Sequence, residues 1–159
     1  MKLTTNFTLK EFLFSPTATA NKITEQFNPP QRILDNITIV ANRLQEIRDR
    51  FGKSMNITSG YRCPRLNTAV GGARASEHLD ALGVDISTRN YTQAETIELI
   101  EIAIELGCKR IGLGATFIHI GFSKQSKHPQ NVVFDYQGTH ATPKYLAKER
   151  ARFIEMMKK

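Results

Sequence analysis

One segment of the sequence, residues 30–51, restricts the possible folds more than any other. Its apolar side chains recur at alternating steps of four and three residues, which places them on one stripe of a helix: Ile33, Ile37, Val40, Leu44, Ile47 and Phe51. Gly52 follows at once and is a typical helix stop. Because a stripe of this kind belongs to a core, the chain is expected to fold as a globular protein around this helix.

Length and composition agree with one globular unit. The chain has 159 residues, 40% hydrophobic and 23% charged, with 10 Gly and 6 Pro, which excludes a disordered, collagenous or low-complexity protein. We expect a single domain over residues 1–159, long enough to form a core without disulfides. The two cysteines, Cys63 and Cys108, lack the spacing of thiol metal ligands and are expected to be reduced.

The sequence shows neither a membrane segment nor a secretory leader. No window approaches about 20 consecutive apolar residues, so no membrane span is expected. The N-terminus lacks the apolar stretch of a secretory signal. These features predict a protein that is cytoplasmic on synthesis.

The charge of the chain favours anionic partners. Lys and Arg outnumber Asp and Glu by 22 to 15, giving a net charge of +7, which suits nucleic acid or acidic cell-wall polymers. Much of this surplus lies in residues 142–159, where we expect a helix with a solvated basic face. Nucleic acid is the least favoured of these partners, since the segment does not resemble a platform for stacking bases.

The remaining elements follow from periodicity and turn residues. A short helix is expected over residues 7–14, where Thr8 and Glu11 form a capping box, and an irregular stretch completes an N-terminal arm, residues 1–30. Further elements are a strand at 55–59, a long irregular stretch at 60–82, a strand at 83–87, a helix at 92–106, strands at 110–113, 116–120 and 131–136, and a final helix at 142–159. Hairpins are expected between the last strands. The fold class is α+β, with a small, mostly antiparallel sheet and helices packed on it.

Polar side chains stand inside two of the apolar strands. In GVDIS, Asp85 faces opposite to Val84 and Ile86, and in TFIHI, His119 faces opposite to its apolar neighbours. Both are costly to bury unless they are paired or bind a metal. Together with His78 they form the set of two histidines and one carboxylate typical of a catalytic zinc site. The spacing alone leaves a second interpretation open, a hydrogen-bonded His–Asp pair without a metal.

Residues 59–86 read SGYRCPRLNTAVGGARASEHLDALGVDI. This segment resembles the signature region of the zinc peptidases related to D-alanyl-D-alanine carboxypeptidases and phage L-alanyl-D-glutamate endolysins, a family that shares its core with the hedgehog signalling domain. The family carries an SGYR segment, a Ser-x-His followed by Asp, and a second His in a later apolar strand. The resemblance covers about residues 5–136 and is closest to short phage or prophage members, so that the final helix is an addition.

This resemblance implies that His78, Asp85 and His119 bind one Zn²⁺, and that Arg62 and Ser76 hold the substrate. An arginine suits a carboxylate in a cleft because its guanidinium presents a planar fork of donors. The implied protein is a metallopeptidase that cuts peptidoglycan stem peptides, as a carboxypeptidase or an endopeptidase. It would act at the bacterial cell wall after phage lysis or as a virion component, and its basic final helix could hold anionic wall polymers.

The sequence departs from the family pattern at several positions. Relatives have Gly and Ala where this chain has Ala81 and Gly83, and a positive φ at residue 81 would be strained by alanine. In addition, many relatives place the acid that takes a proton from the attacking water three residues before the last His. Others have an aspartate two residues after that His. Thr116 and Gly121 occupy these two positions.

Three explanations for the missing acid stay open. Another carboxylate reaches the site, with Glu77 and Asp80 as candidates for the general base and Asp135 as a third; zinc acts without a base; or the domain has lost turnover. The last explanation predicts a different function, a catalytically weak or inactive domain that binds the cell wall or serves in a virion. His128 and His140 lie in polar loops and are expected to face solvent.

Overall fold

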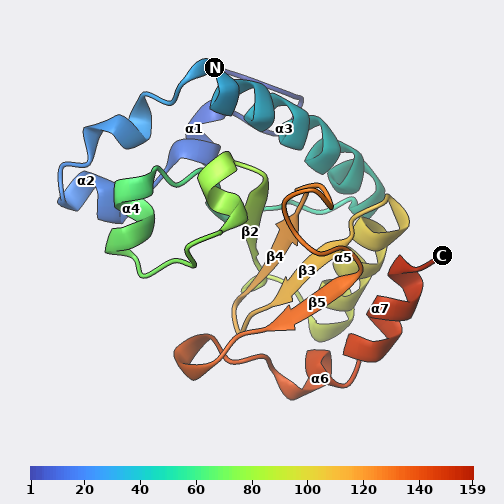
Figure 1. Ribbon diagram of the computed structural model, residues 1–159. Helices are drawn as coiled ribbons and strands as arrows, with labels where there is room; N and C mark the ends of the chain where they lie inside the picture. Colours follow the sequence, from blue (N-terminus) through green and yellow to red (C-terminus); the bar gives the residue numbers. More distant parts are fainter.

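The computed structural model describes residues 1–159 and has the expected α+β architecture, with helices packed on one five-stranded sheet (Figure 1). The elements in chain order are α1 (Leu9–Leu13), α2 (Pro16–Ala20), η1 (Thr24–Phe27), α3 (Gln31–Phe51), β1 (Ile57–Ser59), α4 (Pro64–Ala69), η2 (Glu77–Asp80), β2 (Gly83–Ser87), α5 (Gln93–Glu105), β3 (Arg110–Leu113), β4 (Phe117–Gly121), β5 (Val132–Asp135), η3 (Gly138–His140), α6 (Lys144–Ala147) and α7 (Arg150–Met157). The η elements are short 3-10 helices.

The sheet is mostly antiparallel, as predicted, but its last strand is parallel to its neighbour. The strand order is β1-β2-β4-β3-β5, and only the β3–β5 pair is parallel. The hairpin predicted between β4 and β5 is therefore wrong. Both edges of β4 are already paired, with β2 and with β3, so the chain crosses to the free edge of β3 and adds β5 there.

Helix α3 confirms the predicted apolar stripe, since each of its six stripe residues is at most 3% exposed. Gly52 ends the helix in the left-handed conformation, with φ 73°. Helix α3 packs against α5, and α5 packs against α7. Figure 1 shows these three helices along one side of the sheet. Apolar strand side chains, Val84, Ile86, Ile118 and Ile120 among them, form one buried core with side chains of these helices. The other face of the sheet is left for polar side chains.

The N-terminal arm contains more regular structure than the sequence predicts. Helices α2 and η1 form within the stretch expected to be irregular, because Ser15 caps α2 and Pro16 occupies its first turn. The buried side chain of Gln26 anchors the arm, donating to the Tyr61 carbonyl at 2.8 Å and accepting from the Cys63 N–H at 2.9 Å. The arm is thereby tied to the segment that follows β1.

The C-terminal segment forms two helices rather than the single helix predicted. A turn at Lys148 and Glu149 separates α6 from α7 and brings Arg150 to β5, where its Nε donates to the Val133 carbonyl at 2.8 Å. Leu146 and Phe153 are at most 1% exposed, so both helices contribute to the core. None of the helices in the chain combines the length and the apolarity needed to cross a membrane.

Candidate metal centre and active site

Asp85 and His119 lie directly opposite each other in the β2–β4 ladder. Their strand neighbours, such as Val84, Ile86 and Ile118, are wholly buried in the helix-covered core. Alternation along each strand therefore turns Asp85 and His119 to the other face of the sheet. This confirms the shared face that the sequence predicts for two neighbouring strands.

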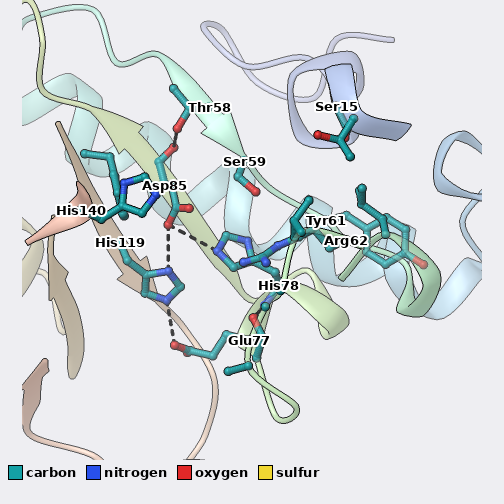
Figure 2. Close-up of a pocket in the computed structure, with 18 of the residues that line it drawn as sticks. Ser15, Thr58, Ser59, Tyr61, Arg62, Glu77, His78, Asp85, His119 and His140 are labelled. Carbon is teal, nitrogen blue, oxygen red and sulfur yellow. Dashed lines mark hydrogen bonds and ion pairs between the residues drawn. The ribbon is translucent and has the colours of Figure 1, made fainter. Parts of the chain in front are cut away.

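His78 reaches the same face from η2. Ser76 caps this short helix by accepting a hydrogen bond from the His78 N–H at 3.2 Å. His78 Nε2 lies 3.4 Å from Asp85 Oδ1, and His119 Nδ1 lies 3.0 Å from the same oxygen (Figure 2). One possible ligand atom from each residue thus lies within 4.8 Å of the other two. We refer to His78, Asp85 and His119 as the metal cluster.

Each imidazole of the metal cluster is held through the ring nitrogen that points away from Asp85. His78 Nδ1 donates to the Gly60 carbonyl at 2.6 Å, and His119 Nε2 donates to Glu77 Oε1 at 2.9 Å. Carbonyl and carboxylate oxygens only accept, so these contacts place a proton on each outer nitrogen and turn the inner nitrogens toward the cluster. Histidines that bind metals are typically held in this way. The donor set fits a divalent cation such as Zn²⁺.

The charges of the metal cluster depend on one another. Burial disfavours an ionised Asp85, but the neighbouring His78 and His119 outweigh burial and lower the pKa of the Asp85 carboxyl. Burial also disfavours a charged His119, yet the Asp85 and Glu77 carboxylates outweigh it and raise the pKa of His119 to about 9. Near neutral pH the metal-free site holds a proton on His119 Nδ1, so a cation that binds there must displace it.

A cavity of about 660 Å³ lies over the metal cluster, and both Arg62 and Ser76 line it. Asn67 holds the Arg62 guanidinium through a 3.0 Å hydrogen bond, while Arg62 Nε is buried and has no hydrogen-bond partner. Burial lowers the pKa of Arg62, although an arginine keeps its charge in proteins. A guanidinium in a cavity wall suits an anionic group of a ligand.

Comparison with protein families agrees with this geometry. Residues 5–121 match the Peptidase M15 family, and this range includes the metal cluster, Arg62 and Ser76. The chain belongs to the Peptidase M15 family. No curated protein matches the chain. M15 peptidases are zinc peptidases, which agrees with the donor set of the metal cluster and with the resemblance noted in the sequence.

In this M15 peptidase, Glu77 lies on the other side of the His119 ring from Asp85 and is 3% exposed. Its Oε1 lies 2.9 Å from both His119 Nε2 and Arg110 Nε, and its Oε2 accepts from the Ser123 N–H at 3.1 Å. Burial raises the pKa of Glu77, but His119 and Arg110 outweigh burial and lower the pKa to about 2. The contacts fit a partner of His119 better than the general base considered from the sequence.

The other carboxylates considered as the base do not line the cavity of this M15 peptidase. Asp80 lies 2.8 Å from Arg32 and 3.8 Å from Lys127. Asp135 accepts a hydrogen bond from Thr142 at 3.2 Å. The structure therefore does not bring either carboxylate to the metal cluster.

An aromatic wall of the cavity consists of residues that the sequence alone did not assign to the site. Phe117, Phe134, Tyr136 and His140 form it, with edge-to-face contacts at centroid distances of 5.0–5.7 Å. His140 is exposed, as expected, but it also lines the cavity. The spacing of Phe134 and Tyr136 could have indicated that they lie together, since residues two apart in a strand share a face. Which face they share depends on the pairing of β5 with β3.

Ala81 has the strained backbone that its departure from the family pattern predicts. It follows η2 with φ 58°, in the left-handed region that favours glycine. The alanine is 1% exposed, so its methyl group is packed in the core. The strained residue therefore lies where the chain passes from η2, which carries His78, to β2.

Proposed function

We propose that this M15 peptidase is a zinc-dependent hydrolase of peptidoglycan stem peptides, acting as a carboxypeptidase or an endopeptidase. The observation that carries the proposal is the convergence of two imidazoles and one carboxylate in a cavity whose wall presents Arg62. Stem peptides combine amide bonds with nearby carboxylates, which matches this pair of features. The family match supports the peptidase chemistry, and the resemblance of residues 59–86 to wall peptidases supports the substrate class.

The protein side chains around the metal cluster have separate roles in this proposal. When bound, zinc supplies a Lewis acid that polarises the scissile carbonyl and lowers the pKa of water. Arg62, held by Asn67, binds a carboxylate of the peptide and orients the chain. Burial and, to a smaller extent, the Asp85 charge raise the pKa of Tyr136, so its phenol stays protonated and can donate a hydrogen bond to the substrate.

His140 is the proposed proton carrier. The carboxylates that line the cavity are Glu77 and Asp85, and both are engaged by other groups. Outside the metal cluster, His140 is the lining residue with an imidazole, the group most often used for general acid–base catalysis. Its ring packs edge-on against Phe117 with centroids 5.6 Å apart. It would take a proton from the attacking water and return it to the leaving amine.

The test is digestion of purified peptidoglycan by the zinc-loaded protein. We expect released peptides whose masses identify the cleaved amide bond, and no release after chelation until zinc is restored. Arg62→Lys keeps the charge but loses the planar fork, so we expect KM to rise about tenfold with little change in kcat. Arg65→Lys is the matched control, because Arg65 is exposed and pairs with Glu25 away from the cavity. Failure of the zinc-loaded protein to release peptides from any main wall type would contradict the proposal.

A domain that binds peptidoglycan without cutting it is the second candidate, and the absence of an acid at Thr116 and Gly121 favours it. It predicts that the zinc-loaded protein sediments with cell walls but releases no peptide. Sedimentation and mass spectrometry on the same sample distinguish the two functions. Release of peptides would exclude the inactive alternative.

We also propose that the protein acts at the bacterial wall, either after phage lysis or within a virion, as the resemblance implies. Probing purified virions and phage lysates with an antibody separates these settings. Detection in virions supports the structural component, detection in lysates alone supports the lysis protein, and absence from both contradicts the proposed location.

The basic C-terminal helices could add affinity for anionic wall polymers. Several of their basic side chains already pair with acidic residues, namely Arg150, Arg152 and Lys158. Lys144, Lys148 and Lys159 form no ion pair, so their charges are free for a polymer. Because α6 and α7 contribute to the core, replacing these three lysines by glutamine is a cleaner test than deletion. Weaker wall binding is expected, with the difference fading as ionic strength rises above about 0.15 M.

A further inference from the structure

We propose that Glu77 is a positioning residue for His119, that Gly121 provides the room for its carboxylate, and that Gly83 leaves space for the His119 ring. The proposal deepens the proposed function, because it names the residue that orients one side chain of the metal cluster. It rests on zinc or a similar divalent cation binding there, and it does not require that the protein cleaves peptidoglycan.

Glu77 is held from three parts of the chain at once. Its backbone lies in η2, Arg110 reaches it from the start of β3, and the Ser123 N–H follows the end of β4. The contacts to His119 Nε2 and Arg110 Nε are both 2.9 Å long, and the Ser123 contact is 3.1 Å. A carboxylate fixed in this way determines both the rotation of the His119 ring and the nitrogen that carries its proton.

The contact of Glu77 with His119 Nε2 also determines what the other ring nitrogen, Nδ1, faces. With the proton of Nε2 directed to Glu77, His119 Nδ1 faces Asp85 Oδ1 at 3.0 Å, where a cation would be shared with His78. Figure 2 shows this alignment, with Asp85 and Glu77 at opposite ends of the His119 ring. Glu77 therefore acts on the metal cluster through His119.

Two glycines make this arrangement possible. A Cβ atom at Gly121 would lie 2.3 Å from both carboxylate oxygens of Glu77, closer than any side chain can approach. A Cβ atom at Gly83 would lie 2.6 Å from Cε1 of His119 and 2.9 Å from Cβ of Glu77. Any larger residue at either position would displace Glu77 or the His119 ring.

The space next to His119 Nε2 can therefore hold one carboxylate, from position 77 or from position 121, but not both. Positions 119 and 121 face the same side of β4, so an aspartate at 121 would project into the volume that Glu77 occupies. Glycine at 121 is then a consequence of the Glu77 carboxylate, whereas glycine at 83 leaves room for the His119 ring. The absence of an acid at Gly121 thus has a structural reason that does not require the loss of activity.

Four proteins test this inference: the native chain, Glu77→Ala, Gly121→Asp, and the double variant. The first readouts are zinc affinity, by competition with a chelator, and the visible absorption spectrum of the Co²⁺-loaded protein. We expect Glu77→Ala to lower zinc affinity about 10–100-fold and to alter the Co²⁺ spectrum, because His119 loses its orienting partner. Gly121→Asp alone should also weaken zinc binding, because two carboxylates then compete for one space.

The double variant gives the decisive result. Its aspartate enters the space left by Glu77, so its zinc affinity should exceed that of Glu77→Ala, and its Co²⁺ spectrum should return toward that of the native protein. Glu98→Ala, at an exposed position on α5, is the control and should leave both readouts unchanged. Native affinity in Glu77→Ala would overturn the positioning role. A double variant whose zinc affinity is no higher than that of Glu77→Ala would overturn the shared space.

Folding is checked separately by thermal unfolding of each metal-free protein. If Glu77→Ala does not fold, Glu77→Gln keeps the volume and one acceptor oxygen. A lower zinc affinity with a partly retained Co²⁺ spectrum is then the expected result, and native affinity again overturns the role. Peptide release is measured on the same samples. The affinity pattern without any peptide release would reject the proposed function alone, whereas peptide release with native zinc affinity in the Glu77 variants would reject this inference alone.

Discussion

The floor and the rim of the cavity are built in different ways. The floor consists of the metal cluster and Glu77, whose side chains come from β2, β4 and η2 and are nearly all buried. The rim comes from the arm around α2 and from the segment that leads from β5 into η3, and it includes the exposed residues Phe14 and His140. Strand pairing fixes Asp85 and His119 in the floor, and the capped helix η2 adds His78 and Glu77. Turns and side-chain packing place the rim.

This difference separates metal binding, which depends on the floor, from substrate binding, which depends on the rim. A change in the floor alters metal binding and stability together, because its charged groups are buried and depend on one another. A change in the rim alters substrate handling and leaves the metal cluster intact, because loops carry function on a rigid scaffold. The predictions below test this separation.

The largest effect is expected on the floor, for His119→Ala. The variant loses a ligand and leaves the Asp85 and Glu77 carboxylates without their shared partner. We expect zinc binding and peptide release to fall below detection, and the metal-free protein to lose about 3 kcal/mol of unfolding free energy at pH 6. Denaturant unfolding and elemental analysis of bound zinc measure the two effects. Unchanged zinc content would contradict the assignment of the metal cluster.

A change on the rim, His140→Ala, is expected to reduce kcat by about 10²–10⁴-fold. Zinc affinity and unfolding free energy should stay at native values, because the side chain is exposed and lies outside the metal cluster. Steady-state kinetics on a stem peptide and chelator competition provide the comparison. Native kcat in this variant would exclude His140 as the proton carrier.

The pH dependence of the floor gives a smaller effect with a defined sign. The pKa of His119 is raised from 6.5 to about 9, so its contribution to the stability of the metal-free protein is complete below about pH 6.5 and is lost as the pH rises through 9. The pKa of Glu77 is lowered from 4.5 to about 2, so its contribution is present above about pH 4.5 and is lost as the pH falls through 2. Stability of the metal-free protein should therefore be greatest between about pH 4.5 and 6.5.

Zinc binding also depends on the proton that His119 holds in the metal-free protein. Because the cation displaces it from His119 Nδ1, binding at pH 7 should release about one proton, and zinc affinity should rise about tenfold per pH unit until about pH 9. Calorimetry in buffers with different heats of ionisation counts the released protons. An affinity that is equal at pH 6.5 and pH 8.5 would show that His119 does not give up a proton to the metal.

The smallest effect is expected at Ala81, beside the floor. Replacement by glycine relieves a left-handed alanine, worth about 1 kcal/mol, and removes a buried methyl group of similar value, so stability should change by less than about 0.5 kcal/mol. Ala103→Gly is the matched control, since Ala103 is also buried but lies inside α5. It should cost about 1–2 kcal/mol. Equal losses in the two variants would show that residue 81 carries no strain.

Much of the floor could be predicted from local sequence patterns. Alternation placed Asp85 and His119 on the polar face of their strands, and the Ser-x-His motif pointed to His78. These predictions succeed because a strand turns successive side chains to opposite faces wherever it lies. The contacts of Glu77 could not be predicted, since they require that η2, Arg110 and Ser123 meet behind His119.

The rim was less predictable. The arm has no hydrophobic period, and its α2 and η1 helices depend on the Ser15 cap and on the contacts of Gln26 with the chain after β1. The position of His140 depends on the pairing of β5 with β3. Strand β5 pairs there because both edges of β4 are already paired.

The sequence by itself determined the long helix of residues 31–51 and the strands that carry Asp85 and His119, because these depend on the spacing of side chains along one element. The resemblance of residues 59–86 to zinc peptidases added His78 and the expected kind of ligand set. Tertiary structure alone decided which carboxylate supports His119, which glycine makes room for that carboxylate, and which rim residues line the cavity. Those outcomes depend on contacts between segments far apart in the chain, and local spacing carries no information about such distances.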